Sequence, residues 1–242
     1  MRIDFTKVLS IFTKNAPLFM HGVVITIVYA LVGTFFGLLI GLILGGIRSL
    51  SINYYDRPII RFFKYLGNLF TEFYIWILRG TPMMVQALFF YYLLKPLVGW
   101  NGLEAGLWII SINTGAYMAE IIRSGIQSVD FGQKEAADSL GLSSFQTLVH
   151  IVLPQAIVNS FPSIGNQLIV NIKDSSMLNV LSVTELFFQT SSIAGSNFRY
   201  IETYFISALI YLVLTSVATW ILNAMERRLT NNNKPSGMDY CA

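Results

Sequence analysis

The chain has 242 residues, of which 54% are hydrophobic and only 12% are charged, and its formal net charge is +3. In soluble domains about a quarter of the residues are charged, so this composition excludes an ordinary soluble globular protein. The single cysteine, Cys241, excludes a disulfide within the chain and any metal site built from several cysteines. His21 and His150 each lack a nearby carboxylate at ligand spacing, so we expect no metal site. No Gly-x-x-x-x-Gly-Lys-Ser/Thr phosphate loop is present, so the chain is not expected to hydrolyse ATP by itself.

The first residues predict a helix that lies in the membrane interface. Phe5, Val8, Leu9, Ile11 and Phe12 recur at helical spacing among polar and basic residues. We therefore expect an N-terminal interfacial segment over residues 1–18 and a transmembrane domain over residues 19–228. The polar residues 229–242 predict a disordered cytoplasmic tail.

Long apolar runs predict the membrane spans, because about 20 apolar residues are needed to cross a bilayer. The first runs from Phe19 to Ile47 and carries glycines at mostly four-residue spacing, which allows close helix packing. Two later spans are expected over Leu103 to Ile122 and Tyr204 to Leu222. With the two further spans described next, the fold class predicted is all-α, a polytopic membrane protein with about five transmembrane helices.

The apolar run from Phe62 to Leu94 is too long for one straight span. Arg79-Gly80-Thr81-Pro82 interrupts it, so we expect one broken helix with a kink at the proline, where Thr81 or Arg79 satisfies the freed backbone groups. On a functional interpretation the break shapes a substrate cavity that Gln86 faces. The alternative is a kink with a structural role only.

A short polar helix between two apolar segments is the most informative stretch of the chain. Gln133 to Leu140 are mostly good helix formers, and Gly141 stands where a helix ends in the left-handed conformation. Ser143 and Gln146 then form the pattern of a capping box, which starts a second helix. We expect a docking element whose face of Ala136 and Ala137 lets another protein approach; the alternative is a solvated loop helix.

The segment from Pro154 to Asn171 has the length of a span but is too polar to face lipid. Polar groups at membrane depth are tolerated where they face protein or a water-filled cavity, so this helix is expected to line a path, with Asn166 and Gln167 as candidate substrate contacts. The alternative is an amphipathic helix on the membrane surface.

Asp174, followed by Ser175 and Ser176, ends this segment and is a candidate for binding the ammonium group of a substrate. Its neighbour Lys173 points about 100° away on a helix, which leaves the carboxylate available for another cation. The competing interpretation is that Asp174 caps its helix or pairs near the outer surface with Arg199.

Basic residues predict the orientation, because cytoplasmic loops are richer in lysine and arginine. The richer side, which would hold the docking helix, carries Arg48, Arg57, Arg61, Lys64, Arg123, Lys134, Arg227, Arg228 and Lys234. The other side carries Arg2, Lys7, Lys14, Lys95 and Arg199.

The motifs together resemble those of a known family. Glu135-Ala136-Ala137, followed by Gly141 and by Ile151-x-Leu153-Pro154, resembles the hallmark loop of the permease subunits of bacterial ABC importers. The stretches Arg79 to Pro82, Gly115 to Val129 and Lys173 to Met177 are similar to the polar amino acid branch, the histidine, glutamine, arginine and glutamate type. Ser124, Ser175 and Met177 differ from residues that are frequent in that branch, which leaves the identity of the substrate open.

The resemblance implies a fold, partners and a mechanism. The fold would be the MetI-like permease fold in a bacterial cell membrane, and the coupling loop would span about residues 124–154. The ATPase contact would comprise Gly132, Gln133, Lys134, Glu135, Ala136, Ala137, Asp138, Leu140, Gly141 and Pro154. Two permeases, identical or paired with a sister chain, would enclose the path, and an external binding protein would deliver the amino acid. ATP would be bound by the separate ATPase subunit, so this chain needs no cofactor, and nucleic acid is not an expected partner.

Three other functions stay open at this stage. A permease for another small solute, such as methionine or a compatible solute, is the nearest alternative. An ion-coupled secondary transporter also uses broken, polar helices, but the chain is short for two inverted halves. A membrane-bound enzyme is disfavoured because the sequence shows no nucleophile paired with a general base.

Overall fold

The structure is a computed structural model that describes residues 4–50 and 57–232. Within these residues it is helical, without a strand, which confirms the all-α class. The elements are α1 (Phe5–Ser49), α2 (Pro58–Gly80), α3 (Met83–Val98), α4 (Gly102–Gln127), α5 (Phe131–Ser139), α6 (Ser144–Thr147), the π-helical turn η1 (Leu148–Val152), α7 (Leu153–Asp174), the 3-10 helix η2 (Ser175–Leu181), α8 (Leu186–Asn197) and α9 (Tyr200–Asn232).

Four helical segments of the described residues are long and apolar enough to cross a membrane. They are α1, α4, the segment Ser144–Leu181 that contains α7, and Tyr200–Leu229 within α9. The bent pair of α2 and α3 makes a fifth when counted as one span. The prediction of about five spans is therefore confirmed.

The first helix is longer than its predicted span. α1 begins at Phe5, where the Asp4 side chain accepts hydrogen bonds from the backbone N–H groups of Thr6 and Lys7, and it continues through Pro17 to Ser49. The segment 1–18 is therefore not separated from the first span by a break within its described residues. At the other end of the chain, α9 continues to Asn232, so the helix passes the predicted start of the tail at residue 229. The rest of that tail lies outside the described residues.

Glycines of α1 allow it to pack closely against α4, as their spacing predicts. A Cβ built on Gly37 would lie 2.5 Å from the Cγ2 atom of Thr114, and one on Gly41 would overlap Met118. Because neither residue has room for a side chain, the two backbones approach one another directly. α4 is in turn mostly buried, with Ile110, Ala116, Met118 and Ile122 fully enclosed.

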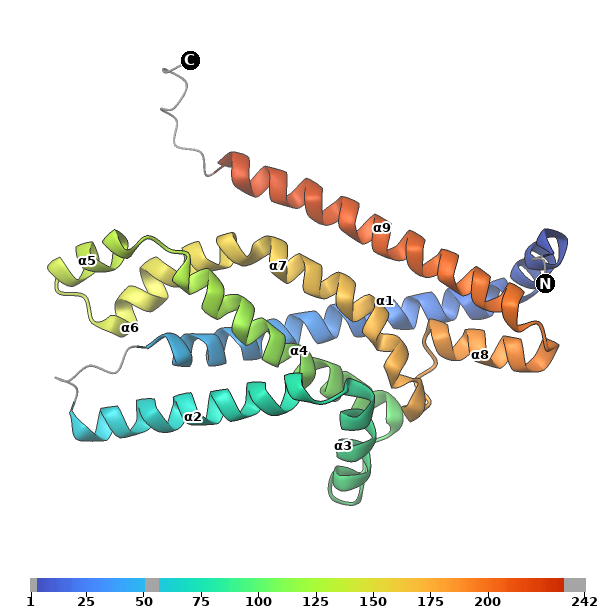
Figure 1. Ribbon diagram of the computed structural model, residues 1–242, viewed down its shortest axis with the longest axis horizontal. Coiled ribbons are helices and arrows are strands. Elements are labelled where there is room, and N and C mark those ends of the chain that lie inside the picture. The colour runs from blue at the N-terminus through green and yellow to red at the C-terminus, as the bar shows by residue number, and fades with distance from the viewer. Residues whose placement is uncertain (1–3, 51–56, 233–242) are drawn as a thin grey trace, which may run out of the picture.

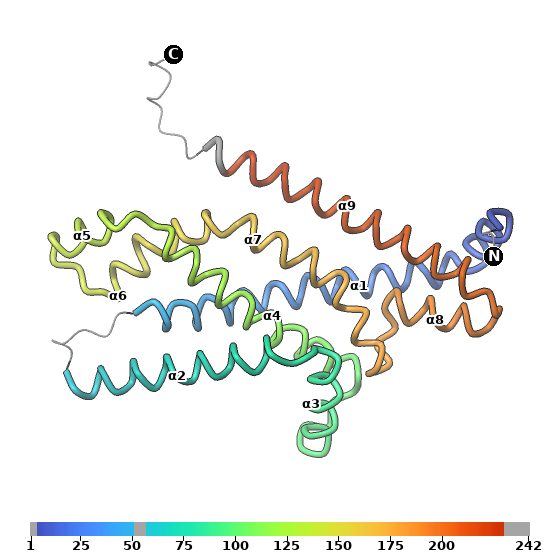
Figure 2. The backbone as a smooth tube through the Cα atoms, in the orientation of Figure 1, coloured from blue at the N-terminus to red at the C-terminus, as the bar shows by residue number. Residues whose placement is uncertain are grey.

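The span around Arg79-Gly80-Thr81-Pro82 turns more sharply than a proline kink. α2 ends at Gly80, Pro82 stands immediately before α3, and the two helix axes differ by 113°. Figure 2 shows α3 turning aside from the line of α2. The prediction of a broken helix at this motif is confirmed, but α3 does not continue the direction of α2.

The arrangement of the helices brings the functional segments to one end. α4 lies between α2 and α7, while α5 and α6 lie at the end of the molecule where α1 ends and α2 begins (Figure 1). The start of α2 and the far end of α9 lie toward this same end, opposite the N-terminus and α8, while α3 lies nearer the middle (Figure 1). The helix ends that carry most of the richer basic set therefore lie together at the end of α5.

Candidate functional site

The predicted docking helix is α5, and its end is fixed by backbone hydrogen bonds. The N–H of Leu142 donates to the Ala137 carbonyl at 3.1 Å, and the N–H of Gly141 donates to the Asp138 carbonyl at 3.0 Å. This pair of hydrogen bonds is a Schellman cap, which needs a residue in the left-handed backbone conformation. Gly141 supplies it, with a φ of +77°. The glycine stop that the sequence predicts is therefore present.

The exposed surface of α5 and α6 is partly apolar. Phe131, Leu140 and Phe145 are 69%, 81% and 64% exposed, which is unusual for side chains of this size outside a membrane. Ala136 and Glu135 are exposed beside them. This end of the molecule therefore offers apolar side chains and a small residue to a partner.

One residue predicted for this surface faces inward. Ala137 is 1% exposed, so the prediction that it shares the open face with Ala136 is wrong. Helical periodicity turns it toward α6 and η1 instead. Lys134 and Asp138 line the crevice of about 210 Å³ between α5 and these turns. The exposed members of the predicted contact are Gly132, Gln133, Glu135, Ala136, Asp138, Leu140, Gly141 and Pro154.

A continuous helical segment leads from this surface into the membrane. The Ser143 side chain accepts from the backbone N–H of Gln146, and the Gln146 side chain accepts from the backbone N–H of Ser143, which confirms the capping box. α6, η1 and α7 then follow without an interruption from Ser144 to Asp174. The wider η1 turn precedes Pro154, whose nitrogen cannot donate to the preceding turn. α5, which ends at Ser139, is joined to this segment through the capped corner at Gly141.

α7 presents a polar stripe on the outside of this single chain. Gln155, Asn159, Ser163, Asn166 and Lys173 recur at helical spacing and are all exposed. One hydrogen bond links this stripe to α4, because the Asn159 amide donates to Ser128, just beyond α4, at 3.0 Å. α4 is linked in turn to α2, where the Arg79 guanidinium lies over the Tyr117 ring at 5.4 Å.

We call the polar side chains that these three helices leave exposed or half-buried the polar face. They are Gln155, Asn159, Ser163, Asn166 and Lys173 of α7, Tyr117, Ser124 and Gln127 of α4, and Glu72 and Arg79 of α2. Polar side chains are costly in contact with lipid, so a surface of this kind within a span indicates contact with protein or water. That α7 lines a path stays a prediction, and α4 and α2 also carry exposed polar side chains.

An ion-pair cluster borders the polar face, and the sequence analysis did not identify it. Glu120 of α4 accepts from Arg48 of α1 and, at 3.0 Å, from Arg123. Arg48 also lies 3.6 Å from Glu72 of α2. A local signal was present in the sequence, because Glu120 and Arg123 stand three residues apart on one helix, but their pairing with Arg48 depends on tertiary contacts.

Polar residues on the opposite side of α7 form a buried network instead of lining the polar face. Asn171 donates to Thr34 at 2.9 Å and accepts from Thr114 at 3.0 Å and from Gln167 at 3.3 Å. Gln167 is therefore bonded inside the bundle, whereas its neighbour Asn166 is exposed. The two residues therefore do not share one face, since adjacent helical residues point about 100° apart, and of these two candidate substrate contacts only Asn166 is exposed.

The three residues predicted to bind an ammonium group differ in position. Ser175 is fully buried and donates to the Ile172 carbonyl, so the structure contradicts its direct contact with a substrate. Ser176 donates to the Lys173 carbonyl. Asp174 is half-buried, and its carboxylate has neither an ion pair nor a hydrogen bond within residues 4–50 and 57–232. The alternative pairing with Arg199 is not formed.

Gln86 holds the break between α2 and α3 together. Its amide nitrogen donates to the carbonyls of Leu78 and Thr81, both at 2.9 Å, and its amide oxygen accepts from Asn113 at 2.9 Å. Thr81 donates to the Ile77 carbonyl, so it satisfies part of the break as predicted. These contacts give Gln86 a structural task that the sequence analysis did not assign to it.

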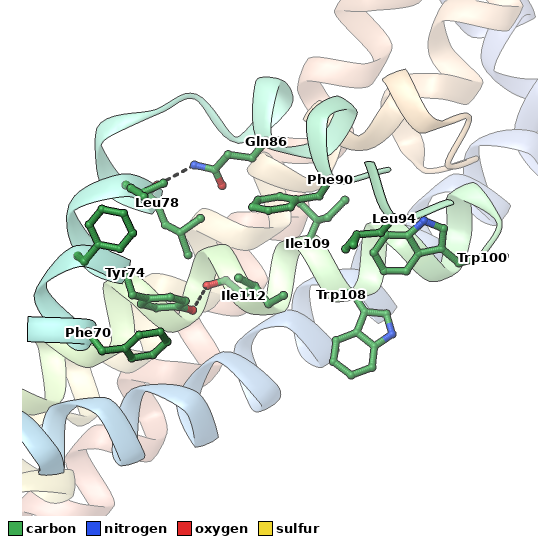
Figure 3. Close-up of a pocket in the computed structure, with 12 residues that line it drawn as sticks. Phe70, Tyr74, Leu78, Gln86, Phe90, Leu94, Trp100, Trp108, Ile109 and Ile112 are labelled. Atoms are coloured by element: carbon green, nitrogen blue, oxygen red, sulfur yellow. Dashed lines mark hydrogen bonds between the residues drawn. The ribbon is translucent and has the colours of Figure 1, made fainter. Parts of the chain in front are cut away.

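The cavity beside Gln86 is hydrophobic. It measures about 300 Å³, and Figure 3 shows Phe70, Tyr74, Phe90, Trp100 and Trp108 among the side chains around it. The Gln86 amide nitrogen turns to the Leu78 carbonyl and the Tyr74 hydroxyl donates to the Ile112 carbonyl, so neither donor is free to bind a charged solute (Figure 3). A contact of Gln86 with substrate remains a prediction that its hydrogen bonds do not favour.

Within the described ranges, no group of three or more histidine, cysteine, aspartate or glutamate side chains could hold a metal ion. His21 instead contacts the Thr184 hydroxyl at 3.2 Å, and His150 contacts the Gln146 carbonyl at 3.0 Å.

Known proteins resemble this chain over most of its length. The glutamine transport system permease protein GlnP of Escherichia coli K12 is 36% identical over 218 residues, which cover 88% of this chain and 93% of that protein. The arginine transport system permease protein ArtQ of Bacillus subtilis is 32% identical over 235 residues, covering 96% and 100%. Both relatives therefore match nearly from end to end.

Solved structures agree with these similarities. A chain from a crystal structure of an amino acid ABC transporter with histidines superposes with a TM-score of 0.78 at 36% identity, covering 94% of this chain and 100% of the other. A chain of the methionine ABC transporter MetNI in an inward-facing conformation gives a TM-score of 0.73 at 18% identity, covering 88% and 96%, which supports the fold.

A family model gives the assignment directly. The model described as the inner membrane component of binding-protein-dependent transport systems matches residues 60–231, which contain the broken span, α5 and the polar face. The resemblance inferred from the motifs is thereby confirmed, and the chain belongs to this family of multi-pass inner membrane transport components.

Proposed function

We propose that this chain is the permease subunit of an ATP-binding-cassette importer for polar amino acids. The observation that carries the proposal is the polar face, because polar side chains on membrane helices need protein or water as their neighbour instead of lipid. A second permease, identical or a sister chain, would close it into a path. The glutamine and arginine permeases that resemble the chain support amino acids as the substrate class.

Coupling to a separate ATPase is the second part of the proposal. The partner would bind the exposed apolar residues Phe131, Leu140 and Phe145 together with Ala136 of α5. Because α6, η1 and α7 are continuous, movement of α5 would act on the helix that carries most of the polar face. A binding protein outside the membrane would supply the substrate, and the ATPase would bind ATP.

Reconstitution tests this function. The chain, the ATPase and the binding protein encoded beside it would be placed in liposomes, with ATP supplied on the ATPase side. We expect uptake of L-glutamine, L-arginine or L-histidine that requires ATP and continues in the presence of a protonophore. Uptake that follows a proton gradient without the ATPase would contradict the proposal, and uptake of methionine alone would restrict it to another solute class.

A further inference from the structure

α9 leaves an apolar groove beside α7 and α1, along which it runs (Figure 1). The groove measures about 500 Å³, and its lining includes Leu31 of α1, Ile164 and Leu168 of α7, and Val217 and Ile221 of α9. Val217 and Ile221 are 50% and 46% exposed, so the groove is open on the outside of the bundle. Because its lining is almost entirely hydrophobic, the groove suits an apolar occupant.

The groove lies on the side of α7 opposite the polar face. Ile164 and Leu168 each stand two residues from Asn166 of the polar face, and two residues correspond to about 200° around an α-helix. A protein that covers the polar face therefore leaves the groove in contact with lipid.

The length of the groove corresponds to one leaflet of a bilayer. It follows α9 from Val213 to Met225, which is about 18 Å at 1.5 Å per residue. The uncharged stretch of α9, residues 203–225, is about 33 Å long on the same basis, so the groove occupies the half of it toward the end that carries α5. Half of the hydrocarbon core is about 15 Å thick, so a single acyl chain of that leaflet can fill the groove.

Arg228 stands where the groove reaches the membrane surface. It follows Ile221 by seven residues and Met225 by three, which places it within about 60° of both around the helix. Arg228 is exposed, and no residue in the described ranges forms an ion pair or hydrogen bond with its guanidinium. Its neighbours Arg227 and Glu226 point about 100° and about 200° away from it. A positive charge therefore lies at the mouth of the groove, on the groove side of α9.

We infer that an anionic phospholipid binds here, with its phosphate at Arg228 and one acyl chain in the groove. Basic residues at the ends of membrane helices attract anionic headgroups, and a planar guanidinium can donate two hydrogen bonds to a phosphate. The apolar groove and the charge beyond it match the two parts of such a lipid. The inference concerns a lipid site and holds independently of the solute that the protein transports.

Native mass spectrometry of the purified protein, with the subunits that copurify with it, tests the inference. The protein in detergent would be titrated with phosphatidylglycerol, with phosphatidylcholine of the same acyl chains, and with glycerophosphoglycerol, which is the headgroup without chains. Wild-type protein should bind phosphatidylglycerol about fivefold more tightly than phosphatidylcholine, as expected for one basic residue at a membrane surface. It should not retain the free headgroup.

Two pairs of variants separate the charge from the groove. Arg228→Gln should reduce the preference for phosphatidylglycerol to less than about twofold. Arg227→Gln, which removes the same charge from the adjacent position, is the matched control and should keep the preference. Ala218→Trp fills the groove and should weaken both lipids alike, whereas Leu212→Trp adds the same bulk to α9 outside the groove and should bind both as wild type.

Four outcomes would overturn the inference. Equal losses in Arg227→Gln and Arg228→Gln would assign the preference to the general charge of the surface. Unchanged lipid binding in Ala218→Trp would place the lipid elsewhere, and retention of the free headgroup would remove the acyl chain from the recognition. Loss of a copurifying subunit from Ala218→Trp but not from Leu212→Trp would assign the groove to a contact between subunits.

Discussion

Gln86 shows how one side chain can stabilise an interrupted membrane helix. Its amide group bonds to two carbonyls at the break and to Asn113 of α4, so three polar groups of the membrane domain depend on it. Such groups cannot bond to water when they are buried, and each unsatisfied one is costly. These contacts therefore favour a role for Gln86 in stabilising the break between α2 and α3 over direct recognition of substrate.

The variant Gln86→Ala distinguishes these two roles. We expect it to lower the free energy of unfolding by about 1–3 kcal/mol, because it removes the 2.9 Å donor to the buried Leu78 carbonyl and the acceptor of the buried Asn113 amide. The order of substrate preference among the amino acids should not change. Thermal unfolding of the purified protein and competition uptake measure the two effects, with Asn166→Ala, which removes an exposed amide, as the stability control. A changed preference order at unchanged stability would support the cavity role that the sequence suggests.

The position of Gly141 requires a positive φ, but it has room for a side chain. Its φ is +77°, and a Cβ at this position would meet no atom within 4 Å. Gly141→Val should therefore strain the corner after α5 by about 1–3 kcal/mol without a clash. We expect the protein to reach the membrane and to lose substrate-stimulated ATP hydrolysis in the reconstituted complex.

The control for this variant is Gly195→Val in α8, where the added side chain also meets open space but φ is not positive. It should retain stimulated hydrolysis. Normal stimulation in Gly141→Val as well would show that the geometry of this corner does not matter for coupling.

At the scale of helices, the contact of α1 with α4 depends on the absence of side chains. Gly41→Ala should overlap Met118 and force the helices apart, with a loss of about 1–3 kcal/mol. Gly46→Ala is the matched control on the same helix, because its Cβ would lie 4.0 Å from the nearest atom, in Leu148. The measurement is the melting temperature of each variant, which should be lower for Gly41→Ala than for Gly46→Ala. Equal values would contradict close packing at Gly41.

Local signals predicted the ends of helices well. Gly141 and the pair Ser143 and Gln146 act within a few residues of chain, so their pattern is sufficient to place the cap and the capping box. The membrane spans were predictable for a similar reason, since length and apolar composition decide them. The extension of α1 to Phe5 was missed because Pro17 is tolerated within the helix.

Side-chain direction was predicted less well, because it depends on tertiary contacts. The 113° turn after Gly80 is held by Gln86 and by Asn113, which is 27 residues further along the chain. Ala137, Gln167 and Ser175 face inward because neighbouring helices cover one side of α5, α7 and η2. A sequence pattern indicates that a helix has two faces, but not which neighbour each face meets.

At the scale of the whole molecule, the polar face predicts a difference in access to water. Single cysteines at Asn159 and Asn166 of α7, in a background with Cys241→Ser, should react with a charged, membrane-impermeant thiol reagent. A cysteine at Leu212 of α9, which is 61% exposed and surrounded by apolar residues, should not react. Labelling of the assembled complex in liposomes is measured by mass spectrometry.

Protection of both α7 cysteines to the same degree as Leu212→Cys would show that lipid or protein covers the polar face completely. That result would contradict a water-filled path along α7.

The outward direction of the polar face also has a consequence for the cell. A copy of the chain that has inserted but not met a second permease would hold Gln155, Asn159 and Asn166 against lipid. Such an orphan subunit is destabilised in the bilayer itself, independently of whether the ATPase is present. Quality-control proteases of the membrane would then recognise unpaired copies by this exposed stripe. Where the partner is a sister chain, the amount of permease that survives would follow the supply of that partner.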